Sequence, residues 1–288
     1  MSAVRPRRSV LYMPAANERA LEKAKTLDAD SIIFDLEDAV APDSKESARI
    51  AACAAASSGH YGRRELTVRC NGLDTPWGAD DLAAIAVSNA AAVVVPKVSS
   101  VAYLDEVAQR LAEAGAPSSM TVWAMVETPT AILDARMIAA HPSVSVLVMG
   151  TNDLARELRA PLAPGRAALL PHLASAVLAA REAGKAILDG VYNDVKDLEG
   201  FERECRQGVE FGFDGKTLIH PGQIDIANEA WAPSGAEVEE ARRTIQAFDA
   251  AVAEGRGVAT VDGRMVENLH VVNAQRVLST AEAIASLS

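Results

Sequence analysis

Cysteine and long hydrophobic runs are scarce in this sequence of 288 residues. Its three cysteines, Cys53, Cys70 and Cys205, are widely scattered and include no CxxC pair, as expected for ordinary thiols of a reducing compartment. The N-terminus, MSAVRPRRSVLYMP, lacks the hydrophobic core of a signal peptide, and no run of about 18 apolar residues occurs. We therefore expect a soluble, cytoplasmic protein without a membrane partner.

Basic residues are also few. The sequence has 28 Lys and Arg against 39 Asp and Glu, a formal charge of −11, and it has no long basic run. Nucleic acids bind extended basic surfaces, so we do not expect nucleic acid as the main partner. No GxGxxG or GxxxxGK[ST] motif follows an apolar run, so the common nucleotide-binding fingerprints are absent as well.

Short apolar runs that alternate with helical patterns fill most of the chain. The apolar runs are 9–13, 31–36, 66–69, 92–96, 122–126, 144–149, 186–188 with an extension to 192, and 211–213 running into 216. The helical patterns between them are 16–27, 44–56, 79–88, 101–114, 130–140, 165–183 and 195–208. Continuous apolar runs are typical of parallel strands buried on both faces. Eight strand-helix units favour an α/β fold, a closed (β/α)₈ TIM barrel, over residues 1–222.

Residues 223–288 are too long a tail to be a simple cap on the barrel. We expect a C-terminal helical extension, with helices near 222–231, 236–254 and from about 269. Between the last two lies Asp262-Gly263, with Glu267 close behind. This segment is either a hairpin turn between short strands or a lid that reaches a neighbouring subunit.

Two carboxylates follow neighbouring strands. Glu127 ends the run 122–126, and Asp153 follows 144–149, so both should lie on the catalytic rim of the barrel. Two close carboxylates repel unless a cation or a proton lies between them, and ligands that are all oxygen favour Mg²⁺. Gly150, Thr151 and Asn152, ahead of a short helix, could hold a substrate carboxylate. Alternatively, the two acids are loop residues and one caps a helix.

Other strand ends are polar too. Asp35, Glu37 and Asp38 follow the second run, and such a cluster is costly unless a cation or hydrogen-bond donors lie nearby. Arg69 ends the third run, where its guanidinium could clamp a substrate carboxylate or, alternatively, pair with these acids. Lys97 ends the fourth run, and we expect it to neutralise the cluster rather than to form a Schiff base.

The motifs around these residues resemble those of a known family. In order they are RSVLYMPAAN, IIFDLEDAV, TVRCNG, VVVPK, the Glu127-Thr-Pro segment, GTNDL, GFDGKTLIHPGQI and DGRMVE. They are similar to the citrate lyase β-subunit-like (HpcH/HpaI aldolase/citrate lyase) family, which includes malyl-CoA lyases, citramalyl-CoA lyases and malyl-CoA thioesterases. The match covers nearly the whole chain and is specific for the family rather than for the substrate.

The resemblance implies a TIM barrel that assembles as a homotrimer or as a hexamer made of two trimers. Its C-terminal segment would close over the site of a neighbouring subunit. The metal, Mg²⁺ with Mn²⁺ as an alternative, would be held by Glu127 and Asp153. Coenzyme A would be present as part of the substrate.

The resemblance also assigns roles to single residues. Arg69 would bind the substrate carboxylate, and Glu37 and Asp38 would stand in the outer shell of the metal, where we count Asp38 among the catalytic residues. Arg19 and Lys23, near the end of the first strand, would contact coenzyme A.

One position departs from the family pattern. The lid motif usually reads D-G-K-M-I-D, and its last Asp serves as acid/base in the neighbouring site, whereas this chain has Glu267 there. Glutamate keeps the proton-transfer group but adds a methylene, and a shift of about one bond length can matter in proton transfer or water positioning.

Four functions follow from these features. The leading hypothesis is a Mg²⁺-dependent carbon-carbon lyase that cleaves a short carboxylated 3-hydroxyacyl-CoA, such as malyl-CoA, into glyoxylate and acetyl-CoA. The alternatives are a (3S)-malyl-CoA thioesterase, which the change to Glu267 favours, a citrate lyase β subunit acting on a citryl thioester, and a non-catalytic CoA-binding assembly protein.

Overall fold

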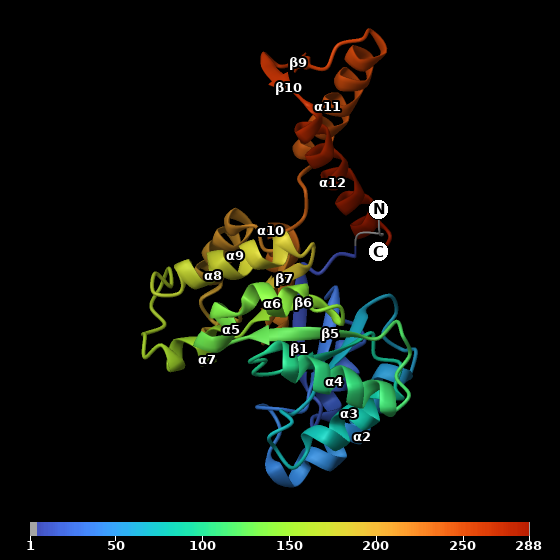
Figure 1. Ribbon diagram of the computed structural model, residues 1–288, viewed down its shortest axis with the longest axis vertical. Coiled ribbons are helices and arrows are strands. Elements are labelled where there is room, and N and C mark those ends of the chain that lie inside the picture. The colour runs from blue at the N-terminus through green and yellow to red at the C-terminus, as the bar shows by residue number, and fades with distance from the viewer. Residues whose placement is uncertain (1–4, 288) are drawn as a thin grey trace. The chain divides into compact units, whose positions relative to one another are not determined.

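A closed barrel of eight parallel strands forms the centre of the computed structural model, which describes residues 5–287 (Figure 1). Each strand pairs with the next in sequence, and β8 pairs back with β1. The strands are β1 (Ser9–Pro14), β2 (Ser31–Asp35), β3 (Glu65–Arg69), β4 (Ala92–Val95), β5 (Thr121–Val126), β6 (Val144–Met149), β7 (Ala186–Asp189) and β8 (Gly215–Leu218). The predicted (β/α)₈ barrel is confirmed.

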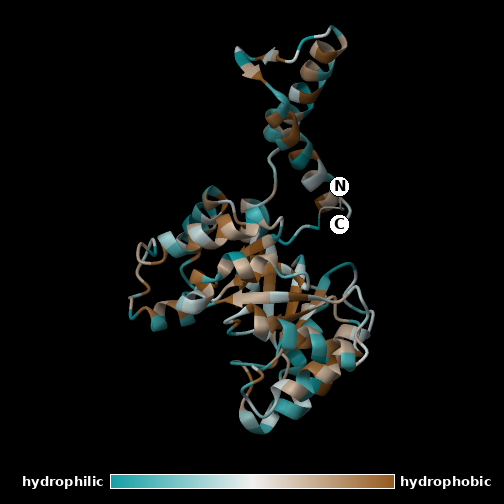
Figure 2. Cartoon of the chain, in the orientation of Figure 1, coloured by the Kyte–Doolittle hydropathy of each residue, from teal (hydrophilic) through white to brown (hydrophobic). Residues whose placement is uncertain are grey.

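The strands form because their apolar runs are buried on both faces. Ile32, Ile33 and Phe34 of β2 are successive residues, and all three are fully buried. The barrel interior is packed around Trp123, which belongs to a cluster with members from six strands. Figure 2 shows hydrophobic residues concentrated in the central strands and polar residues on the surrounding helices. Such two-sided burial explains why the strands lack alternation of polar and apolar residues.

Helices connect the strands on the outside of the barrel (Figure 1). They are α1 (Glu18–Ala24), α2 (Lys45–Ser57), α3 (Gly78–Ala86), α4 (Val101–Glu113), α5 (Pro129–Leu133), α6 (Ala135–Ala140), α7 (Thr151–Glu157), α8 (Leu170–Glu182), α9 (Leu198–Phe211) and α10 (Ile224–Ala230). Two 3₁₀ helices, η1 (Pro42–Ser44) and η2 (Pro221–Gln223), accompany them.

Three boundaries differ from the sequence prediction. The run expected as the eighth strand at 211–213 is wrong, because Phe211 ends α9, Gly212 caps it with φ of 90°, and the strand begins at Gly215. The helix expected at 130–140 is broken at Asp134 into α5 and α6. Helix α8 begins at Leu170 rather than at 165, because Gly165 and Arg166 both adopt positive φ, which interrupts a helix.

The described residues fall into two compact units. One is Arg7–Ala230, which contains the barrel and α10, and the other contains the chain from Trp231 together with residues 5 and 6. The second unit is built from α11 (Gly235–Ala253), the hairpin strands β9 (Ala259–Val261) and β10 (Arg264–Val266), and α12 (Asn268–Ala285). Within residues 5–287, no helix is both long and apolar enough to cross a membrane.

The hairpin of the second unit turns at Asp262-Gly263. Both residues have positive φ, 49° and 77°, which is the conformation that a two-residue turn between antiparallel strands favours. Ala251, Ala259, Val266 and Val271 bury their side chains together beneath it. The hairpin predicted from the sequence is therefore confirmed, and it has its own small core.

Closure of the barrel depends on a close approach at Gly215. A Cβ atom at this position would lie 1.7 Å from the backbone oxygen of Arg7, so Gly215→Ala should force β8 away from the start of β1. We expect a destabilisation of roughly 3 kcal/mol, the upper end of the range for overpacking, seen as a lower Tm. Gly235→Ala is the control, because a Cβ there meets no atom within 4 Å and should leave the Tm nearly unchanged. Equal melting temperatures for the two variants would contradict this account of closure.

Candidate active site

A cavity of about 320 Å³ opens at the carboxyl ends of the barrel strands. It is lined by residues at the ends of β1, β2, β3, β5 and β6 and by the loops after β7 and β8, and its polar members include Tyr12, Asp35, Asp38, Arg69, Glu127, Thr151, Asn152, Asp153 and Thr217. Arg69, Asp38, Glu127 and the segment Gly150–Asp153, all predicted from the sequence, line this one cavity. The rim of the barrel therefore collects the expected polar groups.

Arg69 is held in place by acids of the second strand. Its Nε and Nη2 donate to the two oxygens of Asp35, at 2.6 and 2.7 Å, and its Nη1 lies 2.7 Å from Glu37. Burial alone would raise the pKa of Asp35, but the guanidinium of Arg69 outweighs it and lowers that pKa. The guanidinium also lies over the ring of Tyr12, at 4.9 Å from its centroid. Arg69 pairs with the acids and also lines the cavity. Its two predicted roles, as a partner of the acids and as a clamp for a substrate carboxylate, are therefore compatible.

Lys97 links two carboxylates at the mouth. Its Nζ donates to Oε1 of Glu37 at 3.0 Å, and its backbone N–H donates to Oε1 of Glu127 at 2.6 Å. Lys97 follows Pro96 with φ of 49°, a left-handed conformation that is costly for a residue with a Cβ. Strain of this kind persists where the surrounding contacts dictate the backbone, and it often marks functional sites. The contact with Glu37 agrees with the prediction that Lys97 neutralises the acid cluster.

Glu127 is the buried acid of the site, with 2% of its surface exposed. Burial raises its pKa to about 7, with a further contribution from the charge of Glu37. Within residues 5–287 its only hydrogen-bond donor is the backbone N–H of Lys97, so no cationic side chain compensates its charge directly. Gly150 gives it room, because a Cβ there would lie 2.3 Å from Oε2.

Asp153 lies in the first turn of α7, whose N-cap is Gly150. One of its oxygens, Oδ1, pairs with Arg156 at 2.7 Å, and its side chain is largely buried. Asn152 exchanges two hydrogen bonds with Asn193, which ties the loop after β6 to the loop after β7. The hydroxyl of Thr151 is buried and has no hydrogen-bond partner among the residues described. This short helix therefore presents both a carboxylate and an unsatisfied hydroxyl.

Glu127 and Asp153 fit a Mg²⁺ ion. Mg²⁺ is commonly bound by one or two protein carboxylates, with water and substrate oxygens completing its coordination. Both acids line the cavity, and Glu127 has no cationic side-chain partner among residues 5–287. In the part of the chain that the structure describes, no group of three or more acidic, histidine or cysteine side chains is arranged to hold a metal. The donor set therefore fits Mg²⁺ with several non-protein ligands and is unlike a zinc site.

Three predicted residues lie outside the lining of this cavity. Arg19 and Lys23 are exposed on α1, four residues apart and so on one face of the helix. Glu267 belongs to the second compact unit, where it is the N-cap of α12 and its backbone N–H donates to Nδ1 of His270. Their predicted roles in binding coenzyme A and in proton transfer stay predictions.

Sequence reasoning missed Tyr12, Met125 and Val191, which also line the cavity. Tyr12 and Met125 both point inward from strands that are buried on both faces, so their sequence pattern does not distinguish the cavity side from the helix side. Val191 follows β7 in an irregular loop. A position close to the carboxyl end of a barrel strand was the available signal, and it is shared by many residues.

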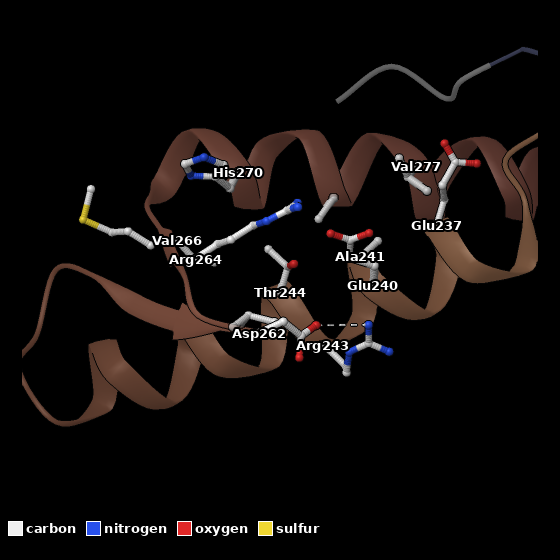
Figure 3. Close-up of a pocket in the computed structure, with 13 residues that line it drawn as sticks. Glu237, Glu240, Ala241, Arg243, Thr244, Asp262, Arg264, Val266, His270 and Val277 are labelled. Atoms are coloured by element: carbon white, nitrogen blue, oxygen red, sulfur yellow. Dashed lines mark ion pairs between the residues drawn. The ribbon is translucent and has the colours of Figure 1, made fainter.

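A second cavity, of about 570 Å³, lies within the C-terminal unit between α11, the hairpin and α12 (Figure 3). Arg243 and Asp262 form an ion pair on one side of it, at 3.5 Å, and Arg264 and His270 face it from the hairpin and α12. The acids that line it, Glu237, Glu240 and Asp262, are all exposed, unlike the buried Glu127 of the barrel mouth. The barrel mouth is therefore the candidate active site.

Comparison with known proteins shows which family the chain belongs to. A family profile described as HpcH/HpaI aldolase/citrate lyase matches residues 8–221. The chain belongs to the HpcH/HpaI aldolase/citrate lyase family. A second profile, a carbon-carbon bond lyase of the TIM-barrel fold, matches residues 167–285. The family predicted from the motifs is confirmed.

Two relatives and one solved structure indicate which activities occur nearby in the family. A (3S)-malyl-CoA thioesterase of Cereibacter sphaeroides is 52% identical over 98% of this chain and 96% of its own length. The citrate lyase subunit beta of Escherichia coli is 37% identical over 96% of this chain and 94% of its own. The structure of CitE from Mycobacterium tuberculosis in complex with magnesium, acetoacetate and coenzyme A has a TM-score of 0.77 at 31% identity and covers 98% of this chain and 99% of that chain. The chain is thus an enzyme of the CoA-ester lyase and thioesterase group, as predicted, whereas the leading lyase hypothesis is not confirmed.

The buried carboxylate of Glu127 should make the metal-free protein less stable as the pH rises. Its folded pKa of about 7 is above the ordinary value of 4.5, so its contribution to stability is present below about pH 4.5 and is lost as the pH rises through 7. Glu127→Gln removes the buried charge. It should therefore raise the free energy of unfolding in EDTA by up to about 3 kcal/mol at pH 8 but hardly at pH 5, which is measured as a higher Tm at pH 8 only. Glu199→Gln, on the exposed surface of α9, is the control. A Tm difference that does not vary with pH would contradict the raised pKa.

The left-handed backbone of Lys97 gives a further prediction. Lys97→Gly and Lys97→Met both remove the ion pair with Glu37 and keep the backbone N–H that binds Glu127. Only glycine relieves the strain of the positive φ, so Lys97→Gly should be more stable than Lys97→Met by roughly 1 kcal/mol in chemical denaturation. If the methionine variant were the more stable of the two, the backbone at this position would not be strained.

Proposed function

We propose that the chain is a Mg²⁺-dependent hydrolase of a short carboxylated 3-hydroxyacyl-CoA such as (3S)-malyl-CoA, releasing malate and coenzyme A. The observation that carries this proposal is the 52% identity with a (3S)-malyl-CoA thioesterase over nearly the whole of both chains. The barrel mouth is consistent with it, because it joins two candidate metal-binding carboxylates to an arginine that could bind a substrate carboxylate.

Glu127 and Asp153 would hold the metal. A bound Mg²⁺ would act there as a Lewis acid that polarises substrate oxygens. Glu127 supports this assignment because it is a buried carboxylate beside Asp153 whose only donor, among residues 5–287, is a backbone N–H. The CitE structure with magnesium and coenzyme A supports the same choice of metal and of substrate class.

Arg69 would orient the carboxylate of the substrate. Its Nε and Nη2 donate to Asp35, and its Nη1 lies 2.7 Å from Glu37 and 4.0 Å from Sδ of Met125, so the plane of the guanidinium is fixed. One N–H group of Nη2 has no partner among the described residues, and Arg69 lines the cavity. The guanidinium of Arg69 lies over the ring of Tyr12, so the ring covers one of its faces. Asp38, 3.7 Å from Arg69, lines the same cavity and would act as an outer-shell acid. Preorganisation of this kind lowers the entropic cost of reaching the transition state.

Glu267 would act as the acid/base from a neighbouring copy of the chain. It would take a proton from the attacking water, which bonds to the thioester carbon as the C–S bond breaks, and the thiolate leaves and is protonated to free thiol. The surface around Glu267 supports a lid role, because Met265, Leu269 and Val272 expose 55–60% of their surface, as a face covered by another subunit would. We propose a homotrimer or hexamer on this ground, with Arg19 and Lys23 at the phosphates of coenzyme A.

The lyase reaction is the second candidate. The same residues would hold malyl-CoA or, in a citrate lyase β subunit, a citryl thioester, and Glu267 would protonate the acetyl-CoA enolate released by carbon-carbon cleavage. The citrate lyase β relative at 37% identity and the carbon-carbon bond lyase profile favour it. The two reactions differ in products, since hydrolysis gives free thiol and the lyase gives glyoxylate.

The direct test is the full-length protein with (3S)-malyl-CoA and Mg²⁺, followed by a thiol reagent and by a hydrazone assay for glyoxylate. We expect free thiol and malate without glyoxylate. Asp153→Asn should reduce this rate by more than about 100-fold, because loss of a Lewis acid costs several kcal/mol of transition-state stabilisation. Glu267→Gln should reduce it by about 100-fold or more, whereas Glu267→Asp keeps the proton-transfer group.

If glyoxylate and acetyl-CoA appear without free thiol, the proposed hydrolase is wrong and the protein is a lyase. Full activity in Glu267→Gln would remove Glu267 from the mechanism. Binding of malyl-CoA without any product would favour a CoA-binding assembly protein.

A further inference from the structure

A second barrel cavity, of about 290 Å³, lies beside the mouth and shares Thr151 and Val191 with it. We refer to it as the side cavity. Its walls come from the loop between α7 and α8, from the loop after β7 and from Glu204 of α9. Leu162 and Pro164 make one wall apolar. The proposed reaction at the mouth assigns no role to this space.

Thr151 stands between the two cavities with its side chain fixed. Gly190 makes room for it, because a Cβ at Gly190 would lie 2.4 Å from Oγ1 and 2.6 Å from Cγ2 of Thr151. The side chain is 2% exposed, and its hydroxyl has no hydrogen-bond partner within residues 5–287. A buried polar group without a partner is rare and costly in a folded protein. Thr151 lines both cavities, so a ligand that reaches past the mouth would lie against this residue.

Arg166 supplies a second unsatisfied group in the side cavity. It is 4% exposed, with φ of 44°, and its Nε and Nη1 bind Gln207 and Asp189 at 2.9 and 2.7 Å. Its Nη2 has no partner among the described residues. Asp189 in turn pairs with the fully buried Lys216 at 2.8 Å, so the guanidinium is anchored from below. The side cavity therefore lacks a hydrogen-bond acceptor for two buried groups.

The charge of the side cavity limits what that acceptor can be. Asp194, Asp197 and Glu204 all line it. Asp194 and Asp197 accept backbone N–H groups at 3.1 and 2.8 Å and hold the loop in place. Glu204 pairs with Lys216 at 2.8 Å and lies 3.5 Å from Nη1 of Arg166. A ligand carboxylate would face Asp194 and Asp197, which form no ion pair among the described residues, whereas an uncharged oxygen would not be repelled by them.

We propose that the side cavity receives the substituent on the carbinol carbon of the substrate, and that it selects an uncharged, oxygen-bearing group such as hydroxymethyl over a carboxymethyl group. The inference rests on the proposed function, because it takes the carboxylate and hydroxyl of the substrate to lie at Arg69, Glu127 and Asp153. The hydroxyl of Thr151 and the Nη2 group of Arg166 would bind the oxygen of the substituent. The acids of the side cavity would exclude a second carboxylate, as a citryl group carries.

The test uses four 2-oxo acids that differ only in this substituent. Glyoxylate, pyruvate, hydroxypyruvate and oxaloacetate carry hydrogen, methyl, hydroxymethyl and carboxymethyl groups, and their binding to the full chain with Mg²⁺ is measured by calorimetry. Hydroxypyruvate should bind about fivefold or more tightly than pyruvate, as expected for one net hydrogen bond. Oxaloacetate should bind more weakly than pyruvate.

Variants assign the effect to the side cavity. Thr151→Val has nearly the same shape, keeps the backbone N–H and lacks the hydroxyl, so it should reduce the affinity for hydroxypyruvate to that for pyruvate. Thr151→Ser should keep the preference. Asp194→Asn keeps the acceptor for the loop and should narrow the difference between oxaloacetate and pyruvate by about fivefold, the effect of one nearby charge. Glu199→Gln, outside the cavity, should leave the whole order unchanged.

The possible outcomes separate this inference from the proposed function. If glyoxylate binds but pyruvate and hydroxypyruvate bind with equal affinity, the inference alone is overturned. A preference for hydroxypyruvate over pyruvate that survives in Thr151→Val would also overturn it. Oxaloacetate binding as tightly as hydroxypyruvate would overturn the charge selection. If none of the four acids binds in the presence of Mg²⁺, the assignment of the mouth as the acid-binding site fails and the inference falls with it.

Discussion

The bidentate ion pair between Arg69 and Asp35 is the contact on which the barrel mouth depends. It joins the ends of β2 and β3, and it places a cation where Glu37 can share it. Through Glu37 and Lys97 this pairing continues to the end of β4, and the backbone of Lys97 carries it to Glu127 on β5. Four adjacent strand ends are thereby linked by polar contacts in a buried setting, where such networks are strong only when their members are satisfied. Glu127, at the end of the series, is the member that pairs with no cationic side chain in the described part of the protein.

This arrangement connects stability to function. A carboxylate buried without a cation is costly, and the cost appears as a pKa raised to about 7. A divalent metal that binds Glu127 and Asp153 would remove this cost. The protein would therefore be least stable when the site is empty and Glu127 is ionised. Gly150 allows the approach of Glu127, and Gly190 allows that of Thr151, so two glycines determine how closely β5, β6 and β7 bring their side chains together. The fold therefore holds the candidate ligands in place ahead of binding, as the proposed chemistry requires.

Much of this could be predicted from the sequence. The strands were recognisable because two-sided burial gives continuous apolar runs, and position at a strand end was enough to nominate Arg69, Glu127 and Asp153. Other features could not be predicted in this way. The eighth strand was misplaced because Phe211 and Phe213 are apolar, although a left-handed Gly212 separates the helix from the strand. The orphaned hydroxyl of Thr151 depends on which atoms surround it after folding, and no local pattern records that. The choice between hydrolysis and carbon-carbon cleavage could not be made from the sequence either, because both reactions would use the same strand ends and would differ in where a proton and a water molecule are placed.

The claim that Glu127 and Asp153 form a metal site at the barrel mouth is tested most directly by diffraction. A crystal of the full chain soaked with Mn²⁺ at pH 8, where Glu127 is ionised, would locate the ion by its anomalous signal. The account predicts one peak per chain, within coordination distance of both carboxylates. A peak elsewhere, or a barrel mouth without one in crystals that bind Mn²⁺ at another position, would contradict it.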